Sequence, residues 1–206
     1  MAESNDLTIL KGRTFTLVLR WETTPIVYKA ITAIEQSAPA RLTVPGHGCV
    51  DGWRAAVTGV KGMPEINAEA NKVRSADYQT VTIVDANTIE FNDLDASGFK
   101  PYVSGGFLQY RTPVDLTGYT GRMKIKDKVG GTVLLSSSAP DAPLNVIDIA
   151  VNNTAKTITL TVHASATTDI SWSRGVYDLE MVSSDLEPVV TRLIGGKVSV
   201  VDEVTT

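Results

Sequence analysis

His47 and Cys49 lie two residues apart in the glycine-rich turn Pro45-Gly-His-Gly-Cys49, where their side chains could support nucleophilic chemistry. A thiol acts as a nucleophile when a nearby base accepts its proton and a further group orients that base. The only other histidine, His163, lies far along the chain at the end of another predicted strand. Because no such set of partners is visible, we interpret His47-Gly48 as a turn element and predict that the protein is not an enzyme.

The segment Asp93-Leu-Asp-Ala-Ser-Gly98 begins like a calcium-binding loop, with oxygen ligands at alternate positions and a glycine at the sixth. The twelfth position, which requires a bidentate glutamate, is Ser104. We therefore predict a polar turn here. Cys49 is the only cysteine, so an intrachain disulfide or a zinc site built on several cysteines is impossible. We expect no metal, no cofactor, and no catalytic or cofactor-binding residue.

The remaining candidates for chemistry also favour structural roles. Asn152-Asn-Thr154 matches a glycosylation acceptor but lies where we predict a hairpin turn. We interpret Asp115 as a turn residue and Asp178 as part of the solvent face of a strand. Four aromatic residues could bind a sugar if they were exposed: Trp53, Trp172, Tyr102 and Tyr119. Because aromatic residues in strands are more often buried, we predict that they belong to the core.

Charge and hydropathy exclude several classes of partner. The 206-residue chain has a net charge of −4 and no basic block, whereas proteins that bind phosphates of nucleic acid need clustered Lys and Arg. No apolar run approaches the roughly 20 residues that span a bilayer, so we expect no membrane span. Residues 1–6 are polar and look loose, with neither a basic nor an apolar segment. We therefore expect no signal peptide, and synthesis in a reducing cytoplasm.

Alternation of apolar and polar residues predicts strands on both sides of a long middle segment. Residues 13–21 alternate strictly, and so do residues 119–126, in which Met123 and Ile125 share one face. The opposite face of that second strand carries Thr120, Arg122, Lys124 and Lys126. Further strands are predicted at 132–135, 175–181 and 193–200, with a short helix at 164–170. The best-defined hairpin pairs Ile147, Ile149 and Val151 with Ile158, Leu160 and Val162.

The middle segment has a different sequence pattern, which predicts short strands joined by glycine-rich turns. An extended run at 26–29 leads into it, after an interruption at Glu22–Pro25. Inside the segment, strands are predicted at 31–34, 41–44, 53–60, 79–84 and 88–91. A single helical turn is predicted to begin at Pro64, because proline is tolerated at the first helical position.

Two groups of residues on either side of this middle segment resemble a known family. Lys11-Gly-Arg-Thr-Phe15 and Asp115-Leu-Thr-Gly-Tyr119 resemble the N-terminal module of phage upper-baseplate proteins. The ending Gly175-x-Tyr-x-Leu-Glu180 with Gly195-Gly-x-Val-x-Val200 resembles the end of the same module. The resemblance implies an all-β fold whose main part is an antiparallel, Ig-like β-sandwich formed by residues 7–30 and 107–203.

The middle segment is similar to a small β-barrel module that recurs in phage tail and other virion proteins, the FCCH-like (first-catalytic-cysteine-half) domain. The matching positions are His47, Gly48, Gly52, Val57, Gly62, Met63, Asn67, Tyr102, Ser104, Gly105 and Gly106. The similarity implies a barrel at residues 31–106, inserted between the first and second strands of the sandwich. It transfers no ubiquitin-activating chemistry, because that domain only accompanies catalytic domains that this chain does not have.

Together the two resemblances cover nearly the whole chain and imply a bacteriophage virion structural protein. We expect a tail or baseplate adaptor that attaches fibres or host-recognition proteins to the tail, in several copies in a symmetric assembly. The expected partners are other phage tail or fibre proteins. A head decoration protein and a carbohydrate-binding module are the alternatives. A glycan binder should expose aromatic residues in a groove, whereas an adaptor should expose patches that match a repeated partner.

The C-terminal segment Val198–Val204 is apolar, and nothing follows it that could cover its edge. An open strand edge is a template for pairing with another chain. We therefore predict that this segment docks on the particle, through an interface formed by Val198, Val200, Val201 and Val204.

Overall fold

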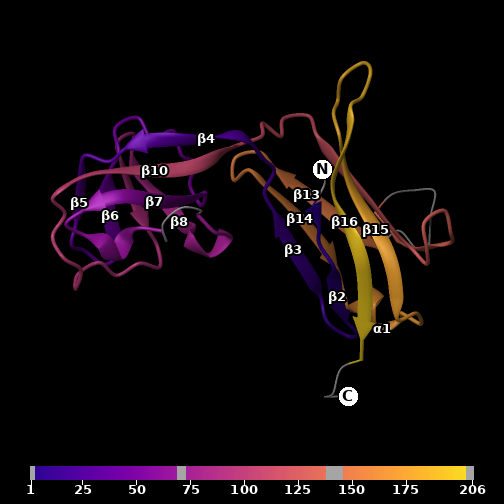
Figure 1. Ribbon diagram of the computed structural model, residues 1–206. Coiled ribbons are helices and arrows are strands. Elements are labelled where there is room, and N and C mark those ends of the chain that lie inside the picture. The colour runs from indigo at the N-terminus through magenta and orange to yellow at the C-terminus, as the bar shows by residue number, and fades with distance from the viewer. Residues whose placement is uncertain (1–2, 69–72, 138–145, 203–206) are drawn as a thin grey trace. The chain divides into compact units, whose positions relative to one another are not determined.

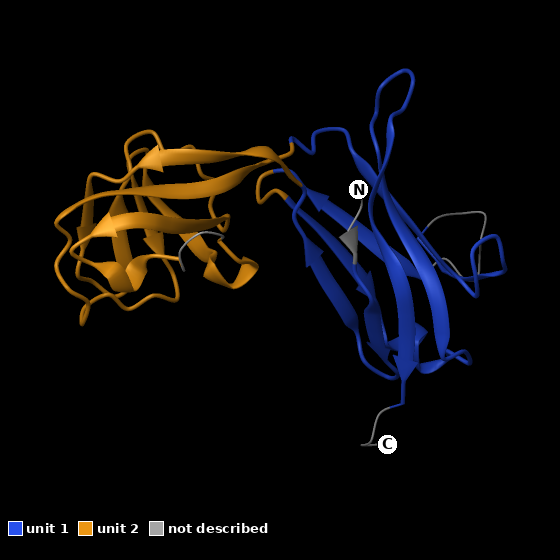
Figure 2. Cartoon of the chain, in the orientation of Figure 1, with its two compact units in different colours: residues 1–21, 115–153, 157–206 blue, residues 22–114, 154–156 orange. Residues whose placement is uncertain are grey.

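The computed structural model describes residues 3–68, 73–137 and 146–202 (Figure 1). Strands make up 53% and helices 6% of the structure, so the predicted all-β class is confirmed. The chain folds into two compact units (Figure 2). Unit 1 contains residues 1–21, 115–153 and 157–206, and unit 2 contains residues 22–114 and 154–156.

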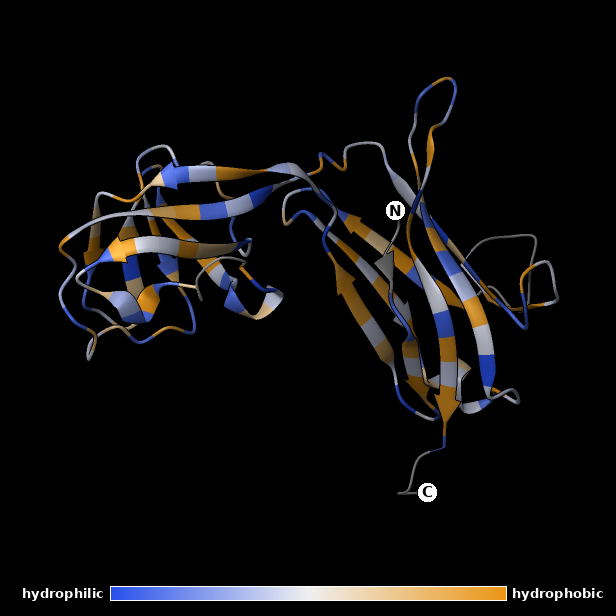
Figure 3. Cartoon of the chain, viewed as in Figure 1, coloured by the Kyte–Doolittle hydropathy of each residue, from blue (hydrophilic) through white to orange (hydrophobic). Residues whose placement is uncertain are grey.

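Unit 1 contains a six-stranded sheet that includes the first two strands of the chain and the last one. Its strand order is β1-β16-β15-β11-β12, and β2 also pairs with β16. The strands are β1 (Glu3–Ser4), β2 (Leu7–Leu10), β11 (Thr120–Lys126), β12 (Val133–Ser136), β15 (Arg174–Val182) and β16 (Val190–Val201). Along β11 and β15 the side chains alternate between buried and solvent-facing, as Figure 3 shows by the alternating colours.

A second, three-stranded sheet of unit 1 has the order β13-β14-β3. Its strands are β3 (Phe15–Leu19), β13 (Ile147–Asn152) and β14 (Thr157–Val162), and the short helix α1 (Ala164–Thr168) follows. The predicted hairpin is confirmed in register, because Ile147 pairs with Val162, Ile149 with Leu160 and Val151 with Ile158.

The two sheets of unit 1 share one hydrophobic core and are therefore sandwich-like. Buried residues of the six-stranded sheet, such as Ile125 and Leu179, belong to the same cluster as Leu160 and Val162 of the three-stranded sheet. Phe15 and the other inward residues of β3 pack against that cluster. Alternation places one face of each strand in this core and leaves the other face to solvent.

The N-terminal strands β1 and β2 lie alongside β16 and pair with it in parallel. Leu7 opposes Val198, and Leu10 opposes Val201. Two expectations are therefore wrong: unit 1 is not wholly antiparallel, and the edge of the C-terminal strand is not open. The region expected to be loose at the start of the chain includes strand residues Glu3 and Ser4, because main-chain pairing needs no apolar pattern.

Unit 2 contains one seven-stranded sheet with the order β4-β10-β7-β8-β9-β6-β5. Its strands are β4 (Glu22–Ala30), β5 (Ala33–Glu35), β6 (Ala40–Thr43), β7 (Arg54–Lys61), β8 (Gln79–Asp85), β9 (Thr88–Phe91) and β10 (Ser104–Pro113). Two 3-10 helices, η1 (Pro64–Ile66) and η2 (Ser75–Asp77), connect β7 to β8. Its core is separate from that of unit 1 and includes the fully buried Trp53, Met63 and Phe91.

The boundaries of the inserted segment differ from those predicted. Residues 22–30 and 107–114 were expected in the sandwich, but β4 and β10 pair with each other in the sheet of unit 2. The insertion follows β3, so it does not follow the first strand. β4 continues through the predicted interruption at Glu22–Pro25, but its register against β10 shifts between Glu22 and Ile26. β4 is an edge strand, where a residue without an N–H is tolerated.

The two ends of the predicted insert do lie close together, since the Ile31 N–H donates to the Gly106 carbonyl at 3.1 Å. Within the described residues, no helix has the length and apolar character needed to cross a membrane.

Candidate functional site

The His47–Cys49 turn holds its histidine by hydrogen bonds to the backbone. His47 is 3% exposed, and its Nε2 lies 2.8 Å from the Asp85 carbonyl oxygen, which can only accept. Nε2 therefore carries the proton, and Nδ1 accepts from the Cys49 N–H at 3.1 Å. Burial raises the pKa of the Cys49 thiol to about 12. The imidazole braces the turn, and the thiol stays protonated at neutral pH.

The aspartates of the calcium-like segment are used in local turn structure. Asp95 Oδ1 accepts hydrogen bonds from the Ser97 backbone N–H at 2.9 Å and from its hydroxyl at 2.5 Å. These bonds lower the pKa of the Asp95 carboxyl group. Ser104 begins β10 instead of closing a loop. In the described part of the chain, no three His, Cys, Asp or Glu side chains gather closely enough to hold a metal ion.

The other polar candidates brace loops or face solvent. Asp115 Oδ1 accepts hydrogen bonds from the Thr117 N–H and hydroxyl, which is the turn role predicted for it. The Asn153 side chain, within the glycosylation-like motif, accepts from the Leu116 N–H at 2.7 Å and donates to Thr117. This amide ties the β13–β14 turn to the loop before β11.

The four aromatic candidates are buried or partly buried. Trp53 is fully buried and donates from Nε1 to the Arg111 carbonyl at 2.9 Å. Trp172 packs against the core of unit 1, and Tyr102 against that of unit 2. Tyr119 contacts Trp21 edge to face, with ring centroids 5.4 Å apart.

Two aromatic residues that the sequence interpretation missed are exposed. Tyr28 of β4 is 56% exposed and Phe107 of β10 is 49% exposed. Their ring centroids are 6.4 Å apart at an interplanar angle of 88°. Alternation along β10 gives no signal for Phe107, because Leu108 and Gln109 after it are both buried. We call Tyr28 and Phe107 the aromatic patch.

The four valines predicted at an interface have different environments. Val198 is 1% exposed and belongs to the core, whereas Val200 is half-buried against it. Val201 is 47% exposed. Val204 lies outside the described residues. Because β15 and β2 flank β16 on both sides, the reason given for this interface, an uncovered edge, is wrong.

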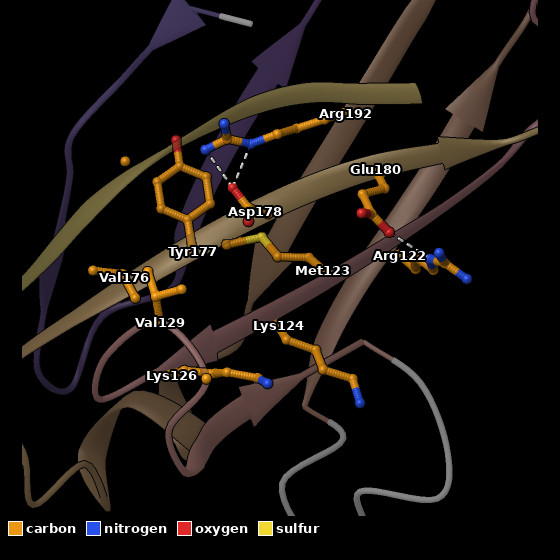
Figure 4. Close-up of a pocket in the computed structure, with 12 residues that line it drawn as sticks. Arg122, Met123, Lys124, Lys126, Val129, Val176, Tyr177, Asp178, Glu180 and Arg192 are labelled. Carbon is orange, nitrogen blue, oxygen red and sulfur yellow. Dashed lines mark hydrogen bonds and ion pairs between the residues drawn. The ribbon is translucent and has the colours of Figure 1, made fainter. Parts of the chain in front are cut away.

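The structure reveals a groove on the outer face of β11, β15 and β16, beside the loop that joins β11 to β12 (Figure 4). Its volume is about 630 Å3. The charged residues that line it are four bases and two acids: Arg122, Lys124, Lys126, Arg192, Asp178 and Glu180. The groove is therefore basic although the whole chain carries a net charge of −4. We call this surface the basic groove.

Cross-strand ion pairs order the floor of the basic groove. Arg122 opposes Glu180 in the register of β11 and β15, and their side chains meet at 2.7 Å. Arg192 meets Asp178 at 2.5 Å. A Cβ atom at Gly195 would overlap both members of the second pair, so glycine at this position of β16 leaves room for it.

An apolar wall completes the groove. Val129 in the β11–β12 loop is 91% exposed, and Val176 lies on the outer face of β15 (Figure 4). Asp127 fixes the loop, because its Oδ1 accepts from the Thr132 N–H at 2.7 Å and from the Lys128 N–H at 2.9 Å. The groove thus combines an excess of basic side chains with the aliphatic side chains of Val129 and Val176, an arrangement that suits binding.

No family model matches this chain, and the search among curated proteins found no match.

Proposed function

We propose that the protein is a bacteriophage virion structural protein without enzymatic activity, a tail or baseplate adaptor that attaches fibres or host-recognition proteins to the tail. The observation that carries the proposal is that unit 1 is formed by segments of the chain that lie before and after unit 2. The two segments that resemble the baseplate module, Lys11–Phe15 and Asp115–Tyr119, belong to one unit although unit 2 separates them in sequence. The resemblance implies that these two segments belong to one interrupted module, although it places the boundaries of the insertion elsewhere.

The finer fold assignment belongs to the same proposal. We assign unit 1 as an Ig-like sandwich and unit 2 as a small β-barrel. Support for the barrel comes from the ends of its sheet order, β4 and β5, which are separated in the chain only by Ile31 and Thr32. Ile31 donates to Gly106 of β10, and Thr32 donates to Thr43 of β6. A link this short brings the two ends of the sheet together, as closure requires.

The partners that we propose are other phage tail or fibre proteins, in a symmetric assembly of several copies in the virion tail. A head decoration protein would use the same kind of exposed surfaces at a different place on the particle. Protein partners fit the apolar side chains exposed in both units, which include the aromatic patch and Val129 of the basic groove.

The second candidate function, glycan binding, has one observation in its favour, the exposed aromatic patch. Two rings at 88° cannot both lie flat against one sugar ring, and the aromatic residue of the basic groove, Tyr177, is buried. The patch therefore suits an inserted protein side chain better. Titration with oligosaccharides, with Tyr28→Ala as the control variant, distinguishes the two functions: shifts in the wild type that Tyr28→Ala abolishes favour glycan binding.

The adaptor proposal is tested on purified particles of the phage that encodes the chain. Quantitative mass spectrometry should find the protein at a copy number that is a multiple of the tail symmetry, and a reconstruction should locate it in the tail. Particles that lack the gene should lose their fibres and regain them when the full chain is supplied. Absence from purified particles overturns the proposal, and a location on the capsid favours the head decoration alternative.

A further inference from the structure

The hairpin between β15 and β16 ends in a tip that is exposed throughout (residues 184–189). Leu186 at its end is 104% exposed, with the carboxylates of Asp185 and Glu187 on either side of it. Val189 is 56% exposed. An isolated apolar residue on a surface needs no explanation, but this leucine lies in the connection of a hairpin that projects from its sheet (Figure 1). We call residues 184–189 the hairpin tip.

The base of the hairpin tip is held in place. The Ser183 N–H donates to the Val189 carbonyl at 3.0 Å, and the Val189 N–H donates to the Ser183 hydroxyl at 2.9 Å. Ser183 is 8% exposed, and the bond from the Val189 N–H to its hydroxyl is partly buried. A tip with an ordered base loses less conformational entropy when it binds, which favours a role in docking.

The hairpin tip and the basic groove are complementary in chemistry. The tip presents carboxylate, isobutyl and carboxylate groups in sequence. The groove presents an excess of basic side chains beside the exposed Val129 and the half-buried Val176. The tip cannot reach the groove of its own chain, because it would have to fold back over β15 and break the paired bonds between Ser183 and Val189. The complementary partner is therefore a second copy.

We infer that copies of this chain associate head to tail, with the hairpin tip of one copy bound in the basic groove of the next. The tip and the groove are different surfaces, so each copy offers one of each and the contact is heterologous. Repetition closes into a ring or extends as a filament. A contact formed by one tip is small, so the association is weak, and its ionic part weakens with salt. This inference goes beyond the adaptor function and does not rest on it.

Sedimentation velocity of the isolated chain over a range of concentrations tests the inference. The wild type should form oligomers whose proportion rises with concentration and falls in high salt. Leu186→Ser in the tip and Lys126→Glu in the groove should each weaken association at least tenfold. The matched controls are Val84→Ser, which changes another exposed apolar side chain, and Lys61→Glu, which reverses another exposed lysine; both should associate like the wild type.

The decisive measurement mixes the two defective variants. Leu186→Ser retains an intact groove and Lys126→Glu retains an intact tip, so the mixture should form dimers and stop there. Circular dichroism of each variant checks folding, and Asp185→Lys provides a second tip variant. A wild type that stays monomeric at every concentration overturns the inference, as does a mixture with no dimer. Binding of an oligonucleotide to the wild-type groove, with no self-association, would also overturn it and point to nucleic acid.

Discussion

Unit 1 buries its apolar side chains between two sheets together with three hydroxyl side chains, those of Ser136, Thr167 and Ser183. Unit 2 buries its apolar side chains against a single seven-stranded sheet together with an imidazole and a carboxamide. His47 and Gln109 of unit 2 are 3% and 4% exposed. Unit 2 also contains seven of the ten glycines with positive φ among the described residues: Gly46, Gly48, Gly52, Gly59, Gly62, Gly105 and Gly106. Unit 1 depends mainly on the alternation of its strands, while unit 2 also depends on the conformations of its turns.

This difference explains which kinds of mutation each unit should tolerate. A strand that alternates can exchange one outward residue for another at little cost, because the face in the core is unchanged. A turn that requires positive φ, or a side chain that satisfies two backbone groups, has few substitutes. We expect the units to be equally sensitive to lost core volume and unequally sensitive to changes in turns.

The largest effect should come from core truncation, which tests whether the units unfold separately. Leu108→Ala in unit 2 and Leu179→Ala in unit 1 each remove a side chain that is fully buried, and each should lower the free energy of unfolding of its own unit by about 3 to 5 kcal/mol. Hydrogen exchange measured by mass spectrometry reports peptides of the two units separately. Equal loss of protection in both units would show that they unfold together.

The second effect tests how strongly the glycine turns of unit 2 are constrained. Gly62 has φ +92°, and a Cβ there would overlap the Pro101 carbonyl and lie 2.6 Å from the Val103 nitrogen. We expect Gly62→Ala to destabilise unit 2 by about 3 kcal/mol through backbone strain and overlap combined. Gly52 has φ +71° with no atom within 4 Å of the added Cβ, so Gly52→Ala should cost only about 1 kcal/mol.

Gly130 provides the matched control in unit 1, with φ +73° and open space around it. Urea unfolding of the three alanine variants measures the order. If Gly62→Ala is no more destabilising than Gly52→Ala and Gly130→Ala, close packing around Gly62 adds nothing to the cost of placing alanine at a positive φ.

Local alternation is visible in a sequence, whereas pairing between distant segments is not, and this determines how much of the fold could be predicted. The β13–β14 hairpin was predicted in register because both arms alternate and the turn is short. The range 88–91 of β9 was also predicted correctly. The parallel pairing of β2 with β16 was not predicted, because it joins residues nearly 200 positions apart and leaves no local pattern. The boundary of unit 2 was misplaced because β4 and β10 pair with each other across most of that unit's sequence, which leaves no local pattern.

The sequence predicts the basic face of the candidate site but does not predict the groove. Alternation in the sequence alone places Arg122, Lys124 and Lys126 on one face of their strand, which is the outer face. The groove also requires the register of β11 against β15, which brings Glu180 opposite Arg122, and a β11–β12 loop that raises Val129 beside them. Register between strands separated by some fifty residues is set by tertiary packing, which a single sequence does not display.

The third largest effect should come from replacing the buried histidine of unit 2, and the exposed histidine of unit 1 provides the comparison. His47→Leu leaves the Asp85 carbonyl and the Cys49 N–H without their partner, and we expect unit 2 to lose about 2 kcal/mol. His163 makes an exposed contact with Asp148, so His163→Leu should change unit 1 by less than about 0.5 kcal/mol. Chemical unfolding of both variants tests this, and equal effects would contradict a bracing role for His47.

The smallest effect concerns alkaline pH. Burial raises the pKa of Cys49 to about 12, whereas in the unfolded chain the thiol loses its proton near its ordinary value of about 8.5. Above that value the unfolded state releases the proton that the folded state keeps, so the free energy of unfolding falls as pH rises and continues to fall up to about pH 12. Tyr110 of unit 2 and Tyr177 of unit 1 also have pKa values raised to about 12, but phenols in the unfolded chain begin to titrate only near pH 10. Between pH 8 and 9 the decrease in the free energy of unfolding should therefore affect unit 2, and it should reach about 1 kcal/mol at pH 9.

Cys49→Ala removes the titrating group and should make the stability of unit 2 as insensitive to pH in this range as that of unit 1. Urea unfolding at pH 7, 8 and 9, followed by hydrogen exchange of each unit, measures the two slopes. Cys49→Ser, which also lacks a group that titrates in this range, should give the same flat profile even if it lowers stability at every pH. A slope in unit 2 that persists in both variants would assign the alkaline loss to another group, and the thiol would no longer distinguish the units.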